Sequence, residues 1–294
     1  MKSIWYIFLI FFCTLIAQGY AHRRHESSDS YYQLSDSYYQ LSVCAIFQNE
    51  ASYLQEWIDH HRKNGVDFFL LYNNNSTDDY KQVLRKYEKA GIVTVVDWLH
   101  NYTTVEEWNK IQVEAYTDAV HRLTNISKWC AFLDTDEFLF CPNGKSIPTV
   151  LKKYGKFAGV VVNWVVYGTS NKEKIRYPEK MLSELVYRSP LDHPVNKHVK
   201  SIVRPKFVQS CSNPHYFVYS SGLYAVNENF ERVDGPFTTE NHVTVFRINH
   251  YWARDLDFLY NQKIPRRTRW GHPAEDILLF ERECNQVYDP ILLK

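Results

Sequence analysis

The chain has 294 residues, which is enough for one large α/β domain or two small domains with a full hydrophobic core. A formal net charge of +1 at pH 7 gives no indication of a nucleic-acid partner. The six cysteines show no C-x-x-C spacing, so a zinc site is not expected. The aromatic share of 16% suits flat ligands such as sugar rings and nucleobases.

The N-terminal part differs from the rest of the chain. Residues 4–17 are almost continuously apolar after a single Lys2, so we predict that residues 1–21 are a signal peptide or an N-terminal membrane anchor. A tandem duplication, Asp-Ser-Tyr-Tyr-Gln-Leu-Ser, occupies 29–42, and its polar composition predicts a linker over 22–42.

From residue 43 onward, the pattern alternates between strands and helices. We predict buried strands at 43–47, 68–72, 92–96 and the apolar run before Asp134, with helices at 53–64, 80–89 and 106–123. This βαβαβ order is typical of the nucleotide-binding half of an α/β fold. Strands at 159–167, 201–208, 216–226 and 243–248, with helices at 256–263 and 276–284, then continue the sheet in mixed order. We therefore predict one globular α/β domain over 43–294.

The stretch Asp134-Thr135-Asp136 follows a short apolar run and precedes another. Unpaired carboxylates inside a buried strand would cost several kcal/mol each, so they belong at its exit, where ligands bind in open α/β sheets. Carboxylate oxygens there can bind a hard divalent cation. We predict an Asp-x-Asp metal site that holds a phosphorylated ligand; solvated loop carboxylates are the alternative. Cys130 and Cys141 flank this stretch, and the sequence leaves open whether they form a disulfide.

Polar residues also follow the first two predicted strands. Asn49 and Glu50 come after the first, and residues 73–79, including Asn75 and Asp78, come after the second. Short polar side chains at these positions can hydrogen-bond a base and ribose. The alternative for the second loop is helix capping by Ser76, Thr77 or Asp78.

Two further features suit a metal-bound phosphate. His250 directly follows a predicted strand, where its imidazole can reach a metal, or it is simply packed beside its aromatic neighbours. Basic side chains that can neutralise a diphosphate, or form a solvated face, are Arg204, Lys197, Lys200, Arg266, Arg267 and Arg269.

Several motifs, in order and spacing, resemble glycosyltransferase family 92 and its family-2-like relatives. They are 43–46 with Asn49-Glu50, 53–58 with His60 and His61, Gly65-Val66, 72–78, Gln112 with Ala115-Tyr116, Asp134-x-Asp136-Glu137-Phe138, Asn249-His250-Tyr251 and Lys263. The resemblance covers roughly 43–290.

The resemblance implies a GT-A fold, a nucleotide-sugar donor (usually a UDP-sugar) and a divalent metal, commonly Mn²⁺, with Mg²⁺ as the substitute. It places Asp134 and Asp136 at the metal and the ribose-diphosphate, and His250 at the metal. It places Asn49, Glu50, Asn75 and Asp78 around the nucleoside. Several family members transfer galactose with inversion.

We therefore predict a glycosyltransferase that moves a hexose from a UDP-sugar to a glycan or another hydroxyl acceptor. Inversion needs a carboxylate base near the acceptor, for which Glu240 and Asp255 are the candidates. The alternatives are an inactive sugar- or nucleotide-binding protein on the same fold and a haloacid-dehalogenase-like phosphatase. The phosphatase motif has Thr or Val two residues after its second Asp, and this chain has Phe138 at that position.

The donor also bears on location, because UDP-sugars are made in the cytosol and imported into the Golgi. A eukaryotic protein would be lumenal behind its N-terminal segment, which suits glycosylation patterns at Asn101 and Asn125. A bacterial one would be anchored to the inner membrane and face the cytosol, which suits Arg23-Arg24.

Overall fold

The computed structural model describes residues 38–176 and 180–293. The predicted signal peptide or anchor, and most of the predicted linker, lie outside these residues. No helix in the described ranges has both the length and the apolar character to cross a membrane.

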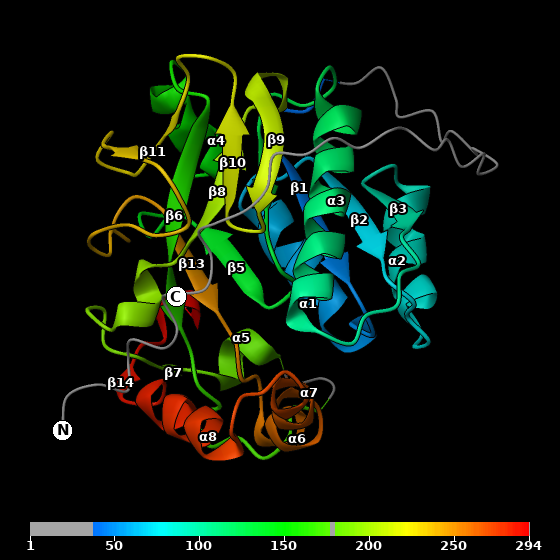
Figure 1. Ribbon diagram of the computed structural model, residues 1–294, viewed down its shortest axis with the longest axis vertical. Helices are drawn as coiled ribbons and strands as arrows, with labels where there is room; N and C mark the ends of the chain where they lie inside the picture. Colours follow the sequence, from blue (N-terminus) through cyan, green and yellow to red (C-terminus); the bar gives the residue numbers. More distant parts are fainter. Residues whose placement is uncertain (1–37, 177–179, 294) are drawn as a thin grey trace. The chain divides into compact units, whose positions relative to one another are not determined.

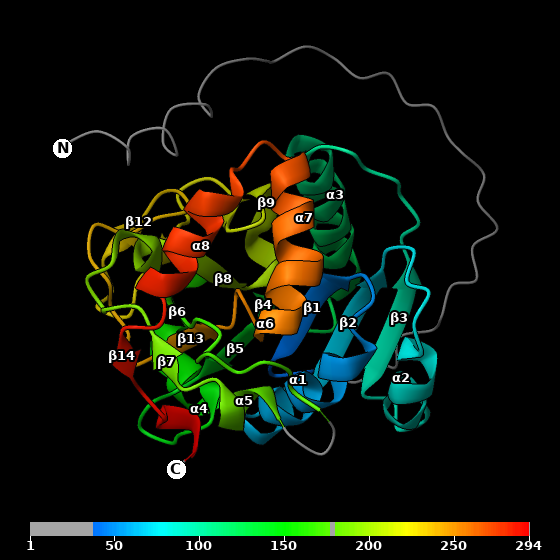
Figure 2. The same ribbon diagram turned by 90° about the horizontal axis from the view of Figure 1, so that it is seen from below.

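The first half of the domain contains the expected alternation of strands and helices (Figure 1). Its elements are β1 (Ser42–Phe47), α1 (Ala51–Lys63), β2 (Phe68–Asn73), α2 (Tyr80–Lys89), β3 (Val93–Asp97), α3 (Val105–Leu123) and β4 (Cys130–Phe132). Figure 2 shows α1 and α2 on one face of these strands and α3 on the other. Helix α1 buries Leu54, Trp57, Ile58 and His61, which is the apolar stripe that helical spacing predicts. A capping box between Thr104 and Glu107 fixes the start of α3.

The second half extends the sheet and adds a helical layer. Its strands are β5 (Glu137–Phe140), β6 (Gly159–Val166), β7 (Tyr187–Arg188), β8 (Val199–Val203), β9 (Val208–Asn213), β10 (Tyr216–Tyr219), β11 (Ala225–Val226), β12 (Arg232–Val233), β13 (Arg247–His250) and β14 (Val287–Tyr288). Its helices are α4 (Ile147–Leu151), α5 (Met181–Glu184), α6 (Leu256–Phe258), a π-helix (Leu259–Lys263), α7 (Ile264–Arg269) and α8 (Ala274–Glu283).

The central sheet has the order β12-β11-β6-β8-β4-β1-β2-β3, and β13 pairs with both β5 and β6. Strands β3, β2, β1 and β4 are mutually parallel, whereas β8 runs antiparallel to β4 and β6. Since β13 is parallel to β6, the carboxyl ends of β1, β2, β4, β6 and β13 share one edge. The α/β class is confirmed, with the parallel half and mixed continuation that the GT-A expectation describes.

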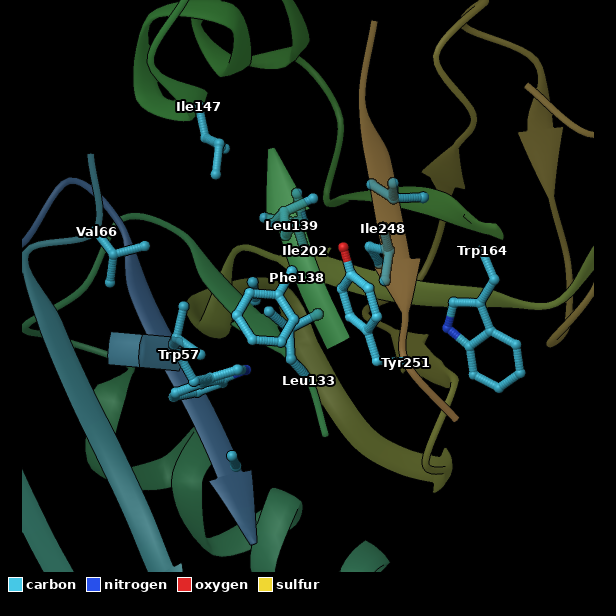
Figure 3. Packing of buried hydrophobic residues seen from close by; sticks show 14 of the residues in the cluster. Trp57, Val66, Leu133, Phe138, Leu139, Ile147, Trp164, Ile202, Ile248 and Tyr251 are labelled. Carbon is cyan, nitrogen blue, oxygen red and sulfur yellow. The ribbon is translucent and has the colours of Figure 1, made fainter. Parts of the chain in front are cut away.

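The core closes around aromatic rings from both halves. The Nε1 of Trp57 donates to the main-chain oxygen of Glu137 at 2.8 Å, and the ring of Phe138 meets that of Tyr251 edge to face at 5.4 Å. Figure 3 shows Trp57, Phe138 and Tyr251 in a row beside β5. This packing holds β5 and the end of the acidic turn, Asp134-Thr135-Asp136-Glu137, against α1.

The domain begins earlier than predicted. The ring of Tyr39 stacks on Phe68 at a centroid distance of 4.6 Å, and its main-chain N–H donates to Ile126 at 2.7 Å. Residues 39–42 therefore belong to the domain and not to the linker. The five cysteines in the described ranges, Cys130 and Cys141 among them, are buried free thiols.

Three strand predictions in the second half were partly wrong. The predicted strand 201–208 breaks after Val203, because Pro205 begins a 3-10 helix. The predicted strand 216–226 is interrupted at Gly222, which has φ +79°. Strand β13 starts only at Arg247, because the carboxylate of Glu228 accepts the main-chain N–H groups of the three residues before it.

Candidate functional site

The acidic turn lies at the carboxyl edge of the parallel strands, between the end of β4 and the start of β5. The main-chain N–H of Asp134 donates to the Glu137 carboxylate at 2.9 Å, and the N–H of Glu137 donates back to the Asp134 carbonyl at 3.1 Å. The carbonyl of Asp136 accepts the N–H of Tyr251 at 2.8 Å. These bonds fix the turn beside the end of β13. The turn lies at the exit of a buried strand, as the sequence predicts.

Both carboxylate oxygens of Asp134 are engaged. Oδ1 accepts from Nε2 of Gln112 on α3 at 2.8 Å, and Oδ2 accepts from Nζ of Lys200 on β8 at 2.9 Å. Lys200 is only 1% exposed. Burial on its own would lower the pKa of Lys200, but Asp134 and Glu137 outweigh it and raise that pKa. Lys200 is therefore the cation that holds Asp134.

Glu137 is the fully buried member of the acidic turn. Its Oε2 lies 3.6 Å from the Lys200 ammonium, whereas its Oε1 has no hydrogen-bond partner among the described residues. Burial raises the pKa of this carboxyl well above its usual range. The family motif contained Glu137, but no function was assigned to it from the sequence. In the structure its carboxylate accepts the Asp134 N–H and lies beside the Lys200 ammonium, so Glu137 stabilises the turn from inside the sheet.

Asp136 points to a different set of side chains. Its Oδ1 is 3.5 Å from Nε2 of His250, and its Oδ2 is 3.9 Å from Nζ of Lys263. Burial would raise the pKa of Asp136, but His250, Lys263 and Arg254 together lower it. The pKa of Lys263 is lowered, first by burial and then by neighbouring arginines. The two aspartates thus have separate environments, one beside Lys200 and one beside His250.

The first two βα loops are joined directly to each other. The Oδ1 of Asn49 accepts the N–H of Thr77 at 2.7 Å, and Oγ of Ser76 accepts the N–H of Asn49 at 2.9 Å. Asn49 and Asn75 both have φ +57°, a left-handed conformation that asparagine tolerates well. The loops therefore form one rigid ledge at the carboxyl edge.

The sequence left open that Ser76, Thr77 or Asp78 caps a helix, and the structure shows a different form of capping. Asp78 Oδ2 accepts the N–H of Ala51 at 2.7 Å and so caps α1, not the helix that follows it in the chain. The N-cap of α2, Asp79, makes no side-chain capping bond. The Oδ1 of Asp78 and the Nδ2 of Asn74 are buried without a hydrogen-bond partner among the described residues. Both atoms are enclosed by neighbouring groups, and Asn74 has no exposed surface.

Arg254 is a residue that the sequence did not single out. Its Nη2 donates to Oε2 of Glu50, and its guanidinium lies over the rings of Tyr53 and Phe258 at 4.0 and 4.4 Å from their centroids. Burial raises the pKa of Glu50, and Arg254 opposes this shift. The pair joins the first βα loop to the chain beyond β13. Only the position of Arg254 shortly after His250 hints at it in the sequence.

The assignment of Arg204 to the nucleotide sugar was wrong. Strand β8 runs antiparallel to β4, with Val203 opposite Cys130, so the residue after β8 lies at the amino end of β4. There Arg204 donates to the Gly155 carbonyl at 2.7 Å and lies over the ring of Trp129. This edge is opposite to the one that carries the acidic turn.

The two candidate bases have different surroundings. Asp255 is buried, and its oxygens accept the N–H groups of Phe258 and Ile175, both at 2.8 Å, so it caps α6. Glu240 is exposed on the loop between β12 and β13. Its neighbour Asn241 donates to the main-chain oxygen of Trp164 at 3.2 Å. The Trp164 ring in turn packs on His250 at 4.4 Å, so this loop lies near the acidic turn.

A divalent cation has two candidate protein ligands at this edge. The Asp136 carboxylate and the His250 imidazole face each other; a carboxylate oxygen suits Mn²⁺ or Mg²⁺, and an imidazole nitrogen is a ligand for transition metals. Within 38–176 and 180–293, no group of three or more His, Cys, Asp or Glu side chains is arranged to hold a metal ion. The protein residues therefore fit a cation whose remaining ligands come from a bound phosphate or water.

Comparisons with known proteins point to one class, the glycosyltransferases. The family model described as glycosyltransferase family 92 matches residues 38–258, and the chain belongs to this family. This assignment removes the phosphatase alternative.

Named relatives agree with the family assignment. A family 92 protein of Oryza sativa subsp. japonica is 31% identical over 63% of this chain and 30% of its own length. The beta-1,4-galactosyltransferase galt-1 of Caenorhabditis elegans is 23% identical over 71% of this chain and 47% of its own length. The chain thus spans less than half the length of these relatives.

Solved structures resemble the chain more distantly. TarS of S. aureus has a TM-score of 0.38 and 13% identity over 57% of this chain and 48% of its own. Glucosyl-3-phosphoglycerate synthase from Mycobacterium tuberculosis has a TM-score of 0.34 and 15% identity over 80% of this chain and 81% of its own.

Proposed function

We propose that this domain transfers a hexose from a UDP-sugar to a hydroxyl group of a glycan acceptor. The observation that carries the proposal is the facing pair of Asp136 and His250, held at the carboxyl edge beside the ledge of the first two βα loops. Ligands of open α/β sheets bind at such an edge. Membership in family 92 supports this class of reaction.

The nucleoside would bind on the ledge that contains Asn49, Asn75 and Asp78. Asn49 and Asp78 each accept a main-chain N–H of the other loop region through one side-chain oxygen. These bonds hold the two loops together, so the ledge is preorganised. The buried Oδ1 of Asp78 and Nδ2 of Asn74 have no partner among the described residues, so the ledge contains one unmatched acceptor and one unmatched donor. Glu50 contributes by holding Arg254.

Asp136 and His250 would hold a divalent cation, with Mn²⁺ the first choice and Mg²⁺ the second. Such a cation acts as a Lewis acid on the leaving diphosphate. Asp134, whose carboxylate Gln112 and Lys200 hold in place, would lie beside the ribose-diphosphate.

Galactose is the first donor sugar to test, because two Arabidopsis thaliana relatives are named galactan beta-1,4-galactosyltransferases. For an inverting transfer, Glu240 is the better candidate base: it is exposed on a loop near Trp164, whereas Asp255 is committed to capping. The base would take the proton of the acceptor hydroxyl as that oxygen joins the sugar.

A second candidate function is nucleotide-sugar binding without turnover. The proximity of the Lys263 ammonium to Asp136, 3.9 Å away, favours it, because this cation already offsets the carboxylate charge. Metal-dependent turnover distinguishes the two functions.

The test is a donor screen with the full chain. The protein is incubated with Mn²⁺ and each common nucleotide sugar, with and without galactan oligosaccharides, and released nucleoside diphosphate is measured. We expect release from one donor, abolished by EDTA and by the double substitution D134A/D136A. UDP binding without any release supports the binding protein, and absence of both UDP binding and release contradicts the proposal.

A further inference from the structure

Arg254 is held in an unusual state. It has φ +52°, a left-handed conformation that is uncommon outside glycine, and its side chain is buried at 2% exposure. One guanidinium nitrogen donates to Glu50, but Nε and Nη1 are buried without a partner among the described residues. Leaving buried N–H groups of a cation unmatched is costly, so these two donors indicate a missing acceptor.

Lys263 reaches the same region through irregular backbone. The π-helix Leu259–Lys263 is followed at once by α7, which contains Pro265 in its first turn. Such wide turns are rare and occur mainly at functional sites. Lys263 is 5% exposed, and its nearest carboxylate oxygen, Oδ2 of Asp136, is too far away for a hydrogen bond at 3.9 Å.

Arg266 is the third cation. It lies on α7, and its Nε is also buried without a partner in the described part of the chain. Arg254 and Arg266 both act on Glu50, whose pKa burial raises and these arginines lower. These three cations act on the carboxylates of Glu50 and Asp136, and Arg267 adds further positive charge beside Lys263. Figure 2 shows α6 and α7 beside β1 and β4; Glu50 comes shortly after the first of these strands and Asp136 shortly after the second.

We infer that Arg254, Lys263 and Arg266 form a diphosphate-binding clamp whose open N–H groups bind the phosphate oxygens of the nucleotide sugar. This inference rests on the proposed function for its ligand. Arginine suits the site because its planar fork matches phosphate oxygens, and a diphosphate supplies the negative charge and the acceptors that the site lacks. In this arrangement the leaving diphosphate is bound by side chains that follow β13 in the chain, and not by Arg204, which follows β8.

The test measures binding of inorganic pyrophosphate, inorganic phosphate and UDP to the full chain by calorimetry in EDTA. The substitutions are R254K, which keeps the charge opposite Glu50, and R266M. R204M is the matched control, because it removes a cation from the opposite edge. We expect the wild-type chain to bind pyrophosphate more tightly than phosphate. R254K and R266M should each weaken pyrophosphate and UDP binding about tenfold, and R204M should change it less than about twofold.

Circular dichroism verifies that each variant is folded, and R266M keeps the test decisive if R254K is not. Failure of the wild-type chain to bind pyrophosphate overturns the clamp, as does unchanged binding by the folded variants. Pyrophosphate binding with the expected variant pattern supports the clamp even where no nucleotide sugar serves as donor. In that event it is the proposed function that fails.

Discussion

The Lys200 ammonium lies 2.9 Å from Oδ2 of Asp134 and 3.6 Å from Oε2 of Glu137, so one buried cation joins the acidic turn to an antiparallel strand. Asp134 also keeps part of its side chain exposed at the carboxyl edge, whereas Glu137 is fully enclosed. The turn therefore depends on Lys200 for its shape as well as its charge.

Replacing Lys200 with methionine should destabilise the domain by about 3–5 kcal/mol, because it leaves a buried carboxylate without its cation. The measurement is urea unfolding at pH 7. Lys110 provides a control: it is largely exposed and its contact with Glu114 is 3.9 Å, so K110M should change stability by less than about 0.5 kcal/mol. Equal stability of K200M and the wild-type chain would show that Lys200 does not hold the turn.

Stability should fall as the pH drops from about 6.5 toward 4. His61 accepts the N–H of Leu139 at Nε2 and contacts the Trp57 carbonyl through Nδ1, an arrangement that only the neutral ring satisfies. Burial lowers the pKa of His60 to about 4 and that of His61 well below its usual range. The unfolded chain therefore binds more protons below pH 6.5, and each such group costs up to about 1.4 kcal/mol per pH unit.

Thermal melts from pH 7.5 to 4.5 measure this dependence. H61Q should reduce this dependence and leave the contribution of His60, because glutamine offers a donor and an acceptor without titrating in this range. H121Q, at the exposed end of α3, serves as the control and should leave the slope unchanged. A melting temperature that stays level down to pH 4.5 in the wild-type chain would contradict the prediction.

Two substitutions at Asn49 should separate its side-chain bond from its backbone conformation. Both N49G and N49A remove the bond from the Thr77 N–H to Oδ1. Alanine also has to adopt φ +57°, which costs about 1 kcal/mol more than it does for glycine. Denaturant unfolding should therefore rank the wild-type chain above N49G and N49G above N49A. The reverse order of the two variants would exclude backbone strain at this position.

Removing the proposed metal ligands should abolish the effect of Mn²⁺. H250A leaves Asp136 without its facing imidazole. Mutating a residue that only hydrogen-bonds to a metal ligand typically costs roughly 10–100-fold, so we expect kcat/KM of H250A to fall by more than this. Electron paramagnetic resonance of bound Mn²⁺ reports the same loss without turnover. H215A, which removes a histidine bonded to the Val199 carbonyl, is the comparison variant. Mn²⁺ binding by H250A as strong as in the wild-type chain would rule out His250 as a ligand.

The sequence by itself determined the α/β class, the elements of the first half and the acidic turn at a strand exit. These features depend on local signals: apolar runs, helical spacing and carboxylates that cannot remain inside a strand. The same signals located the neighbouring loops and His250, because carboxyl ends of parallel strands share an edge.

Only the tertiary structure decided which distant side chains complete that edge. Lys200 and Arg204 are close in sequence and both basic, yet the antiparallel direction of β8 sends Lys200 to the acidic turn and Arg204 to the opposite edge. Arg254 reaches Glu50 across 204 positions of the chain. Local patterns carry no information on strand direction or on pairings at such separations, because both follow from how the whole core packs.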